Sequence, residues 1–436
     1  MRPSDEGNVA PAKRPGGANQ IPPLPDWPMA DSRTVAYAML RDAGPVIKRH
    51  HGVYMIVSSD AAEFALRHPE LFSSRQAFDV VGSPLPLVPI AFDPPEHTRY
   101  RRILQRFFSP RGIAAWQPTV AELAGELIES LAGRGECDLV AELAAPLPTQ
   151  VFLTLFGLPL ADRDQLIYWK DGLIRDFGPP MEPAPDPAAT SAKAQAGPVP
   201  LGGRMRLQRV MRIGAELYEY LAGHIARRRQ REDTSDLLGQ LLADTSDERL
   251  DDSEILGLSF LFVLAGLETV TSALSTGFAL LAARPELRRH VAEDPSSIPN
   301  AVEELLRFDG PVVFVPRIAT RDVTLAGQLI PAGAHVNVAV AVADRDPAEH
   351  PDPDEIDLGR QERHLAFGVG PHRCLGSHLA RMELRVTMAE WHRRIPEYQL
   401  APGVTPRVTW PSGVVSIPSL PLVFPGKYER PVRDDE

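Results

Sequence analysis

Hydrophobic residues recur at helical spacing over most of the chain. Five segments carry apolar side chains three and four positions apart, the repeat of a helix with a buried face: 118–132, 162–176, 205–232, 253–283 and 298–308. Strand-like patterns are confined to 53–57, 322–340 and 413–424, and glycine and proline interrupt the second of these. The pattern predicts a mainly α protein with small peripheral β-sheets (α+β) and no internal repeat.

Composition divides the chain into one large domain and three irregular segments. Residues 1–26 are rich in proline, glycine and charge, which predicts a disordered tail, and 426–436 form a second tail. Residues 178–203 are rich in proline and alanine without apolar periodicity, which predicts a long loop, either a lid or a disordered insertion. The remaining residues, 27–425, are expected to form a single domain.

Charge and cysteine content exclude several classes of protein. The 436 residues carry a net charge of -11 and no basic tract, which argues against nucleic-acid binding. The two cysteines, Cys137 and Cys374, are far apart, so a disulfide framework is excluded and a reducing cytoplasm is expected. The N-terminus lacks the apolar core of a signal peptide, and the longest apolar run, 255–266, is too short to span a bilayer. We expect a cytoplasmic protein without a membrane segment.

The segment HLAFGVGPHRCLGSHLARMELRVTMAEW, residues 364–391, is the most informative in the chain. Phe367, Gly370, Cys374 and Gly376 follow the spacing F-x-x-G-x-x-x-C-x-G, and the glycines allow the backbone to fold tightly around a side chain. Apolar residues at 375, 379, 382 and 386 mark a helix directly afterwards. A thiolate is stabilised where a loop enters a helix, and a single thiolate suits one axial bond to haem iron.

Cys374 has three other possible interpretations. Most lone cysteines are unreactive buried residues. His364, His372 and His378 could join Cys374 around zinc, although the two-residue spacing of His372 and Cys374 fits zinc ligand pairs poorly. A nucleophilic cysteine needs an activating base, and none is identifiable at a known register.

The helix expected at 253–283 carries a single charge between residues 255 and 283, that of Glu268. A buried carboxylate needs a partner, a water or a functional reason. The hydroxyl of Thr269 can bond the carbonyl of Ala265 four residues earlier, and Gly266 weakens the same turn. A helix opened there could hold oxygen and an ordered water; the alternative is a buried helix with a surface glutamate.

In these features the chain resembles the cytochrome P450 family from about residue 27 onwards. The cysteine pattern resembles the family's haem loop, and Ala265–Thr269 resembles its A/G-G-x-D/E-T oxygen-activation motif, with Glu268 where many members have Asp. The resemblance implies a triangular helical prism around a buried haem b (iron protoporphyrin IX), with Cys374 as axial ligand. It also implies that Thr269 hydrogen-bonds dioxygen during its activation and that Glu268 relays protons.

The resemblance assigns further residues to the haem and its support. Glu304 and Arg307 match the family's E-x-x-R pair, which braces the thiolate loop, and Arg360 is the candidate third member; elsewhere such a pair is usually a weak surface contact. His97 and Arg101 lie four residues apart on one helix face, and the alternative for them is an exposed polar face. The residues implied to contact haem are His97, Arg101, Arg317, His372, Phe367, Gly368, Ala265 and Gly376.

Apolar residues occupy the positions that line the family's substrate pocket, although most such residues in any protein are core. We expect an aliphatic or polycyclic substrate with few polar anchors, such as a terpenoid, steroid, fatty-acid-like or polyketide-type molecule, and segment 178–203 as a lid. The expected pocket residues are Leu85, Leu87, Val88, Leu261, Leu264, Ala265, Val312, Val313, Phe314, Val415 and Ile417.

The resemblance also implies the reaction and its partners. We expect a monomeric monooxygenase that hydroxylates or epoxidises its substrate. The chain has no dinucleotide-binding fingerprint, so the electrons should come from a ferredoxin and its reductase, and Arg99, Arg102 and Arg106 form a candidate basic docking patch. The alternatives are a peroxide-dependent or rearranging enzyme of the same fold, and a haem sensor or carrier without chemistry.

Overall fold

A computed structural model describes residues 33–49, 52–78, 83, 85–175, 203–231, 233–361, 363–409 and 413–426. The expected N-terminal tail, 1–26, lies outside the described residues. The expected lid segment, 178–203, also lies outside them, except for residue 203. The expected C-terminal tail, 426–436, lies outside them except for residue 426. The division into these segments therefore stays a prediction.

Helices make up most of the described chain, which confirms the predicted fold class. They are α1 (Arg33–Asp42), α2 (Ser59–Arg67), α3 (Glu96–Phe108), α4 (Pro110–Ala114), α5 (Gln117–Leu131), α6 (Pro146–Leu155), α7 (Arg163–Arg175), α8 (Gly203–Arg228), α9 (Leu237–Leu242), α10 (Asp252–Phe262), α11 (Glu268–Ala283), α12 (Pro285–Glu293), α13 (Ile298–Asp309), α14 (Val340–Ala343) and α15 (Ser377–Arg394). Shorter π- and 3-10 turns are η4 (Val140–Ala144), η5 (Leu160–Asp162), η6 (Val263–Leu267) and η7 (Pro295–Ser297).

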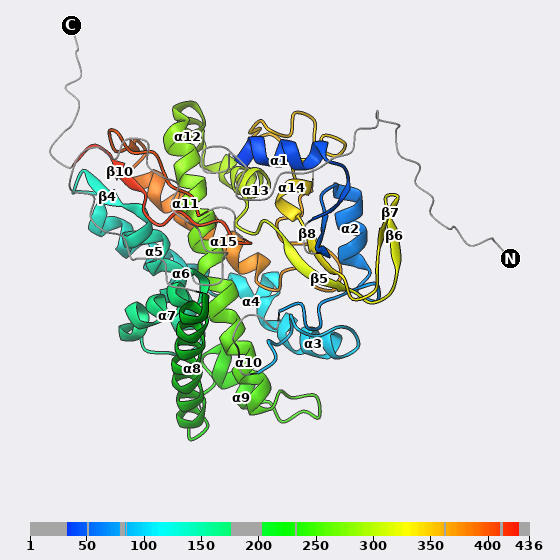
Figure 1. The fold of residues 1–436 in the computed structure, drawn as a ribbon. Coiled ribbons are helices and arrows are strands. Elements are labelled where there is room, and N and C mark those ends of the chain that lie inside the picture. Colours follow the sequence, from blue (N-terminus) through cyan, green and yellow to red (C-terminus); the bar gives the residue numbers. More distant parts are fainter. Residues whose placement is uncertain are drawn as a thin grey trace, which may run out of the picture.

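The helices α10 and α11, joined by the π-helical turn η6, form one long rod through the molecule (Figure 1). Its N-terminus is fixed by a capping box, in which Asp251 accepts from the Glu254 backbone N–H and Glu254 accepts from that of Asp251. The stretch Asp252–Ala283 is long and apolar enough to cross a membrane, but 72% of its apolar window is buried inside the protein. It is therefore the core helix that the sequence predicts.

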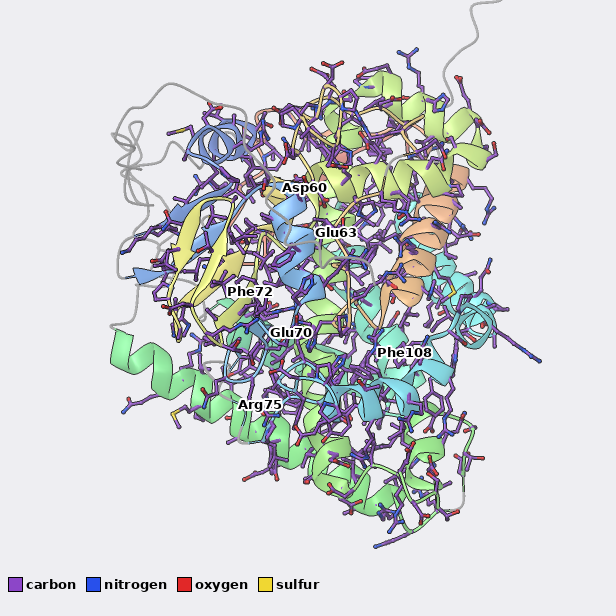
Figure 2. All side chains as sticks on the ribbon, turned by 90° about the vertical axis from the view of Figure 1, so that its right-hand side faces the viewer. Asp60, Glu63, Glu70, Phe72, Arg75 and Phe108 are labelled. Atoms are coloured by element: carbon purple, nitrogen blue, oxygen red, sulfur yellow. The ribbon has the colours of Figure 1, made fainter. Side chains whose placement is uncertain are left out.

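Two sheets lie on different sides of this rod (Figure 1). The larger has the order β1 (Val46–Lys48), β2 (Tyr54–Ile56), β8 (His335–Val338), β5 (Val315–Ala319) and β3 (Phe72–Ser73), with β2 and β8 parallel and the other pairs antiparallel. Figure 2 views the face of the molecule that carries α2 and this sheet. The smaller sheet has the order β4 (Glu136–Asp138), β10 (Pro421–Val423) and β9 (Gln399–Leu400), and β6 (Val323–Leu325) pairs with β7 (Gln328–Ile330).

The expected strand at 413–424 is shorter in the structure than predicted. Only Pro421–Val423 pairs as a strand, and Val414 makes an isolated bridge with Val312. Pro418 and Pro421 lack the backbone N–H that a longer ladder would need.

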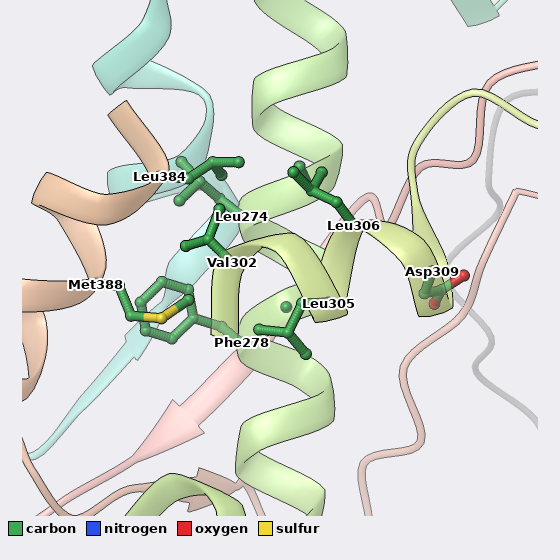
Figure 3. Close-up of a pocket in the computed structure, with 10 residues that line it drawn as sticks. Leu274, Phe278, Val302, Leu305, Leu306, Asp309, Leu384 and Met388 are labelled. Carbon is green, nitrogen blue, oxygen red and sulfur yellow. The ribbon is translucent and has the colours of Figure 1, made fainter. Parts of the chain in front are cut away.

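One part of the main core lies where α11, α13 and α15 meet (Figure 3). Leu274 and Phe278 from α11 pack there with residues of α13 and Leu384 and Met388 of α15, around a small cavity of about 10 Å³. This packing fixes α15, the helix that follows Cys374, against the central rod.

Candidate active site

The loop before α15 is shaped by two glycines with left-handed backbone conformations. Gly368 has φ 60° and Gly370 has φ 73°. A Cβ on Gly370 would also lie 2.4 Å from the carbonyl oxygen of Leu66, so only glycine fits this position. The turn brings the Cys374 N–H to within 2.8 Å of the Phe367 carbonyl oxygen, where it donates a hydrogen bond. The loop thus holds the cysteine backbone in a fixed position.

Gly376 differs from Gly368 and Gly370 in its backbone conformation. Its φ is −81°, a value that any residue adopts, and a Cβ there would meet no protein atom within 4 Å. The expectation that this glycine supplies a special backbone conformation is therefore wrong. The absence of a side chain leaves open space beside the cysteine instead.

The thiol of Cys374 keeps exposed surface although protein surrounds it. Burial raises the pKa of the Cys374 thiol, while a hydrogen bond from Gly376 and the charges of Arg101 and Arg381 act in the opposite direction. A positively charged ligand atom, such as a metal ion, would favour the thiolate at this position.

Four donor side chains gather beside the loop from three parts of the chain. His97 lies on α3 and its ring centroid is 4.1 Å from that of His372. Arg101, also on α3, donates to the Arg373 carbonyl oxygen at 2.9 Å. Arg317 on β5 is 4% exposed and donates to the carbonyl oxygen of Pro316 at 2.7 Å, its own chain neighbour.

Burial lowers the pKa values of three members of this cluster, and neighbouring positive charges lower those of the two histidines further. Burial, followed by the charge of Arg101, lowers the pKa of His97 to about 4. Burial and then Arg317 lower the pKa of His372 to about 2, and burial lowers the pKa of Arg317 to about 10. The Nε2 atom of His372 is buried without a hydrogen-bond partner. The cluster is therefore suited to an anion.

The Glu304–Arg307 pair of α13 is fully buried, not the weak surface contact that such spacing usually gives. Arg307 donates to both Glu304 carboxylate oxygens, Nε to Oε2 at 2.7 Å and Nη2 to Oε1 at 2.8 Å. Arg307 also donates to the carbonyl oxygens of Asp344, Pro353 and Glu355. The structure places Arg360 Nε 3.3 Å from Glu304 Oε1. The pair thus ties α13 to the segment that precedes the cysteine loop.

The central rod is locally opened where Ala265, Gly266 and Thr269 lie. The five residues of η6 form a π-helical turn, and Ala265 and Gly266 keep exposed surface within it. Thr269 Oγ1 donates to the Ala265 carbonyl oxygen at 2.7 Å. π-turns inside long helices commonly occur at functional sites.

Glu268 has a partner that sequence reasoning missed. Lys170 of α7 pairs with the Glu268 carboxylate, and its Nζ also lies 2.8 Å from Asp171 Oδ1. The Lys170 and Glu268 side chains are 3% and 6% exposed. The ion pair therefore connects the start of α11 to α7, whose last residue, Arg175, precedes the undescribed segment that contains the expected lid.

Two of the three candidate zinc-binding histidines contact other side chains. His364 Nε2 lies 3.1 Å from Glu303 Oε2, whereas His372 contacts His97. Across the described ranges, no group of three or more histidine, cysteine or acidic side chains is placed to hold a metal ion. A zinc site around Cys374 is not supported by this arrangement.

The expected pocket residues fall into two groups. Leu85, Leu264, Ala265, Val312 and Phe314 keep exposed surface. The others are buried in the hydrophobic core: Leu87, Val88, Leu261, Val313, Val415 and Ile417. The buried residues can influence the shape of a pocket only indirectly, through the side chains that cover them.

Each arginine of the candidate docking patch is paired with an acid. Arg99 binds Glu254 at 2.7 Å, Arg102 binds Glu248, and Arg106 binds Asp244 at 3.0 Å. The acids offset the positive charge that a docking patch for an acidic protein would need.

A glycine-shaped cysteine loop, a cluster of two histidines and two arginines beside it and an opened central helix define a haem-thiolate class of protein. The Cytochrome P450 family model matches residues 45–394. The chain belongs to the cytochrome P450 family and is a monooxygenase.

The relatives described next cover between 75% and 89% of this chain. It is 34% identical over 383 residues to vitamin D(3) 25-hydroxylase of Pseudonocardia autotrophica, covering 85% of this chain and 88% of the relative. It is 34% identical to mycinamicin IV hydroxylase/epoxidase of Micromonospora griseorubida, with coverages of 75% and 76%. The crystal structure of CYP109E1 from Bacillus megaterium in complex with testosterone superposes with a TM-score of 0.78 at 28% identity, covering 89% and 97% of the two chains.

The family implies a haem-thiolate cofactor, and the described residues fit one. The buried donors His97 and Arg317 and the partly buried His372 suit two carboxylate groups, and the Nε2 atom of His372 has no hydrogen-bond partner among the described residues. Near Cys374, a Cβ added to Gly368 or Gly376 would meet no neighbouring atom within 4 Å, so a flat ring system can approach the backbone there.

Proposed function

We propose that this chain hydroxylates or epoxidises a large, weakly polar small molecule of the polycyclic or macrocyclic kind, with haem b and electrons from a ferredoxin. The observation that carries the proposal is Cys374 beside the donors His97, Arg101, Arg317 and His372, among which the Nε2 atom of His372 is buried without a hydrogen-bond partner in the described part of the chain. Haem, when bound through its iron to the Cys374 thiolate, supplies the oxygen-activating redox chemistry.

The chain's own residues hold the cofactor in this proposal. His97, Arg101, Arg317 and His372 bind the two propionates, the histidines through hydrogen bonds and the arginines through charge as well. Glu304 and Arg307 hold the segment before the loop in place, and Arg360 adds a third arm.

Proton delivery is assigned to the opened turn of the central helix. The Thr269 hydroxyl, which donates to Ala265 in the structure, can turn to donate a hydrogen bond into the space beside η6. Glu268 can pass protons to that space only when its carboxylate is released from Lys170, because a carboxylate held in a buried ion pair is not available for transfer.

The substrate class is inferred from pocket candidates and relatives together. The five candidates that keep exposed surface are Leu85, Leu264, Ala265, Val312 and Phe314, and none carries a polar side chain. Such a wall favours apolar surface over polar anchors. Two relatives are named for vitamin D(3) and mycinamicin IV, and the CYP109E1 structure is a complex with testosterone; these molecules are ring systems of this kind.

Thiolate ligation is tested by the difference spectrum of the reduced protein with carbon monoxide. We expect the long-wavelength Soret band of a thiolate-bound haem in the wild-type protein and its loss in Cys374→Ser. The matched control is Cys137→Ser, because Cys137 is a buried cysteine of β4 and should leave the band in place. A band that survives Cys374→Ser would refute the proposal.

Substrate class and electron donor are tested on the same protein. Spin-state titration should respond to steroids or macrolides more strongly than to short fatty acids.

Turnover with a ferredoxin and its reductase should exceed turnover with hydrogen peroxide; the reverse result would make the enzyme peroxide-dependent.

The docking site for the ferredoxin can be located with two arginines. Arg373 is exposed beside Cys374 and has no acidic partner among the residues that the structure describes, whereas Arg102 is paired with Glu248. We expect Arg373→Glu to raise the KM for ferredoxin several-fold and to make it less sensitive to salt, with a smaller effect for Arg102→Glu. Equal effects of the two substitutions would contradict this placement.

A further inference from the structure

Adjacent glutamates on α13 hold different parts of the chain around Cys374. Glu304 binds Arg307 and Arg360 and accepts from the Asp357 N–H, all on the segment before the loop or on α13 itself. Glu303 faces the other way, toward the loop and α15. The family's motif explains the first glutamate and leaves the second without a role.

Glu303 binds three groups. The Nε atom of Arg381 lies 2.8 and 2.9 Å from its two carboxylate oxygens, and Arg381 Nη2 lies 2.7 Å from Oε2. Arg385 Nη2 lies 2.9 Å from Oε1 and His364 Nε2 lies 3.1 Å from Oε2. Burial opposes ionisation, but the hydrogen bonds from His364 and Arg381 hold the pKa of Glu303 well below its usual range. The carboxylate is therefore a charged anchor.

The anchored Arg381 guanidinium lies over the ring of Phe367, 4.2 Å from the ring centroid. Its side chain is 18% exposed, so solvent screens the charge only in part. Phe367 is the residue whose carbonyl oxygen accepts the hydrogen bond of the Cys374 N–H, at 2.8 Å. One chain of contacts thus leads from Glu303 through Arg381 and Phe367 to the backbone of the cysteine.

His364 binds the Glu303 carboxylate from the other end of the loop. The Ala366 N–H donates to His364 Nδ1 at 3.2 Å, so Nδ1 is an acceptor and Nε2 carries the proton that is donated to Glu303. The two ends of the loop, at His364 and on α15, are therefore fastened to a single carboxylate.

We propose that Arg381, held over Phe367 by Glu303, is a positioning residue that sets the reduction potential of the thiolate-bound haem. The inference rests on the proposed haem ligation by Cys374. One-electron reduction adds a negative charge to the cofactor and its thiolate, and a fixed cation with little solvent around it favours that charge. The Arg381 charge therefore raises the potential, and the Glu303 carboxylate moderates the effect.

The test is the haem reduction potential of reconstituted variants, measured by spectroelectrochemistry. We expect Arg381→Gln to lower the equilibrium constant for reduction at least threefold, a fall of about 28 mV at about 59 mV per tenfold change for one electron. Glu303→Gln should shift the potential upward, because it removes a negative charge and keeps hydrogen-bonding capacity. The opposite signs distinguish this role from a merely structural one.

Arg385→Gln is the matched control. Arg385 binds the same carboxylate but is 40% exposed, and it is Arg381 that lies over the Phe367 ring, so loss of Arg385 should change the equilibrium constant less than twofold. Arg381→Lys should leave the reduction potential close to the wild-type value, because lysine keeps the positive charge although it loses the planar contact with the ring.

Equal shifts in Arg381→Gln and Arg385→Gln, or no shift in either, would overturn the proposal. If Arg381→Gln fails to retain haem, Glu303→Gln carries the test, and a potential in this variant that is unchanged or lower than in wild type would overturn the proposal as well. The carbon monoxide spectrum separates the two levels of inference. A wild-type protein without the long-wavelength Soret band refutes the proposed function, whereas a normal band with unshifted potentials refutes only the role of Arg381.

Discussion

Lys170 and Glu268 form a buried ion pair between α7 and the central rod. Removal of one member of such a pair leaves an uncompensated charge in a poorly solvated place, which typically costs about 3–5 kcal/mol. The two members are not equivalent here. Lys170 also contacts Asp171, so it keeps an acidic neighbour when Glu268 is neutralised, whereas Glu268 has no other basic partner among the described residues.

We therefore expect Lys170→Met to lower the free energy of unfolding by about 3 kcal/mol and Glu268→Gln to lower it by less. The double variant Lys170→Met/Glu268→Leu should recover most of the loss, because two apolar side chains of similar size leave no buried charge. Urea unfolding of the haem-loaded proteins, followed by circular dichroism, measures the difference. A double variant no more stable than Lys170→Met would contradict this explanation.

The two neighbours Glu268 and Thr269 differ in what the sequence could predict about them. The Thr269 bond to Ala265 follows from helix geometry, because a carbonyl four residues back is always within reach of a threonine hydroxyl. The partner of Glu268 lies 98 residues away on another helix. The sequence indicates that a buried carboxylate needs a partner, but only the tertiary packing of α7 decides which.

Helices α10 and α11 each contain a glycine in a buried stretch, and the two sites differ in available space. A Cβ on Gly277 would lie 3.6 Å from Leu305 Cδ1, an ordinary contact, next to the small cavity in Figure 3. A Cβ on Gly257 would lie 2.5 Å from the carbonyl oxygen of Pro86, which only a backbone movement could relieve.

We expect Gly277→Ala to raise the free energy of unfolding by about 0.5–1 kcal/mol, because alanine loses less backbone entropy in a helix. Gly257→Ala should lower it by about 1–3 kcal/mol through the forced shift of the backbone. Thermal unfolding of the two variants beside wild type checks both signs. A destabilised Gly277→Ala variant would mean that the cavity cannot accept a methyl group.

At the scale of elements, apolar spacing predicts α5, α7, α8, the α10–α11 rod and α13 to within about a turn of where the structure has them. The sequence predicts the long central helix but not its π-turn, because an apolar run has the same composition in an α-helix and in a π-helix. The strands are harder to predict, since β2 pairs with β8 across most of the sequence and local patterns do not specify such partners. The C-terminal strand is overestimated because its prolines interrupt the ladder.

Across the whole molecule, stability should depend on pH through a buried acid in α15. Burial raises the pKa of Glu383 to about 8 from an ordinary value of 4.5, and one of its oxygens is buried without a hydrogen-bond partner. Between these two pH values the folded protein holds a proton that the unfolded chain has lost. Its stability contribution is therefore fully present below about pH 4.5 and is lost as the pH rises toward about 8.

We expect the stability of the wild-type protein relative to Glu383→Gln to fall by at most about 1.4 kcal/mol per pH unit in this window. The comparison with the variant is needed because the buried histidines, with lowered pKa values, act in the opposite direction below about pH 6.5. Melting temperatures of both proteins from about pH 5 to about pH 9 provide the measurement. Parallel curves would show that Glu383 is ionised in the folded state.

The parallel pairing of β2 with β8 has a consequence for the order of events during protein synthesis. Tyr54–Ile56 leaves the ribosome early, and the strand beside it, His335–Val338, is made about 280 residues later. Until then the early strand has one edge without its native neighbour, and unpaired strand edges promote aggregation. The speed of translation through the middle of the mRNA, and chaperone binding during that time, should therefore affect the yield of native protein more than its final stability.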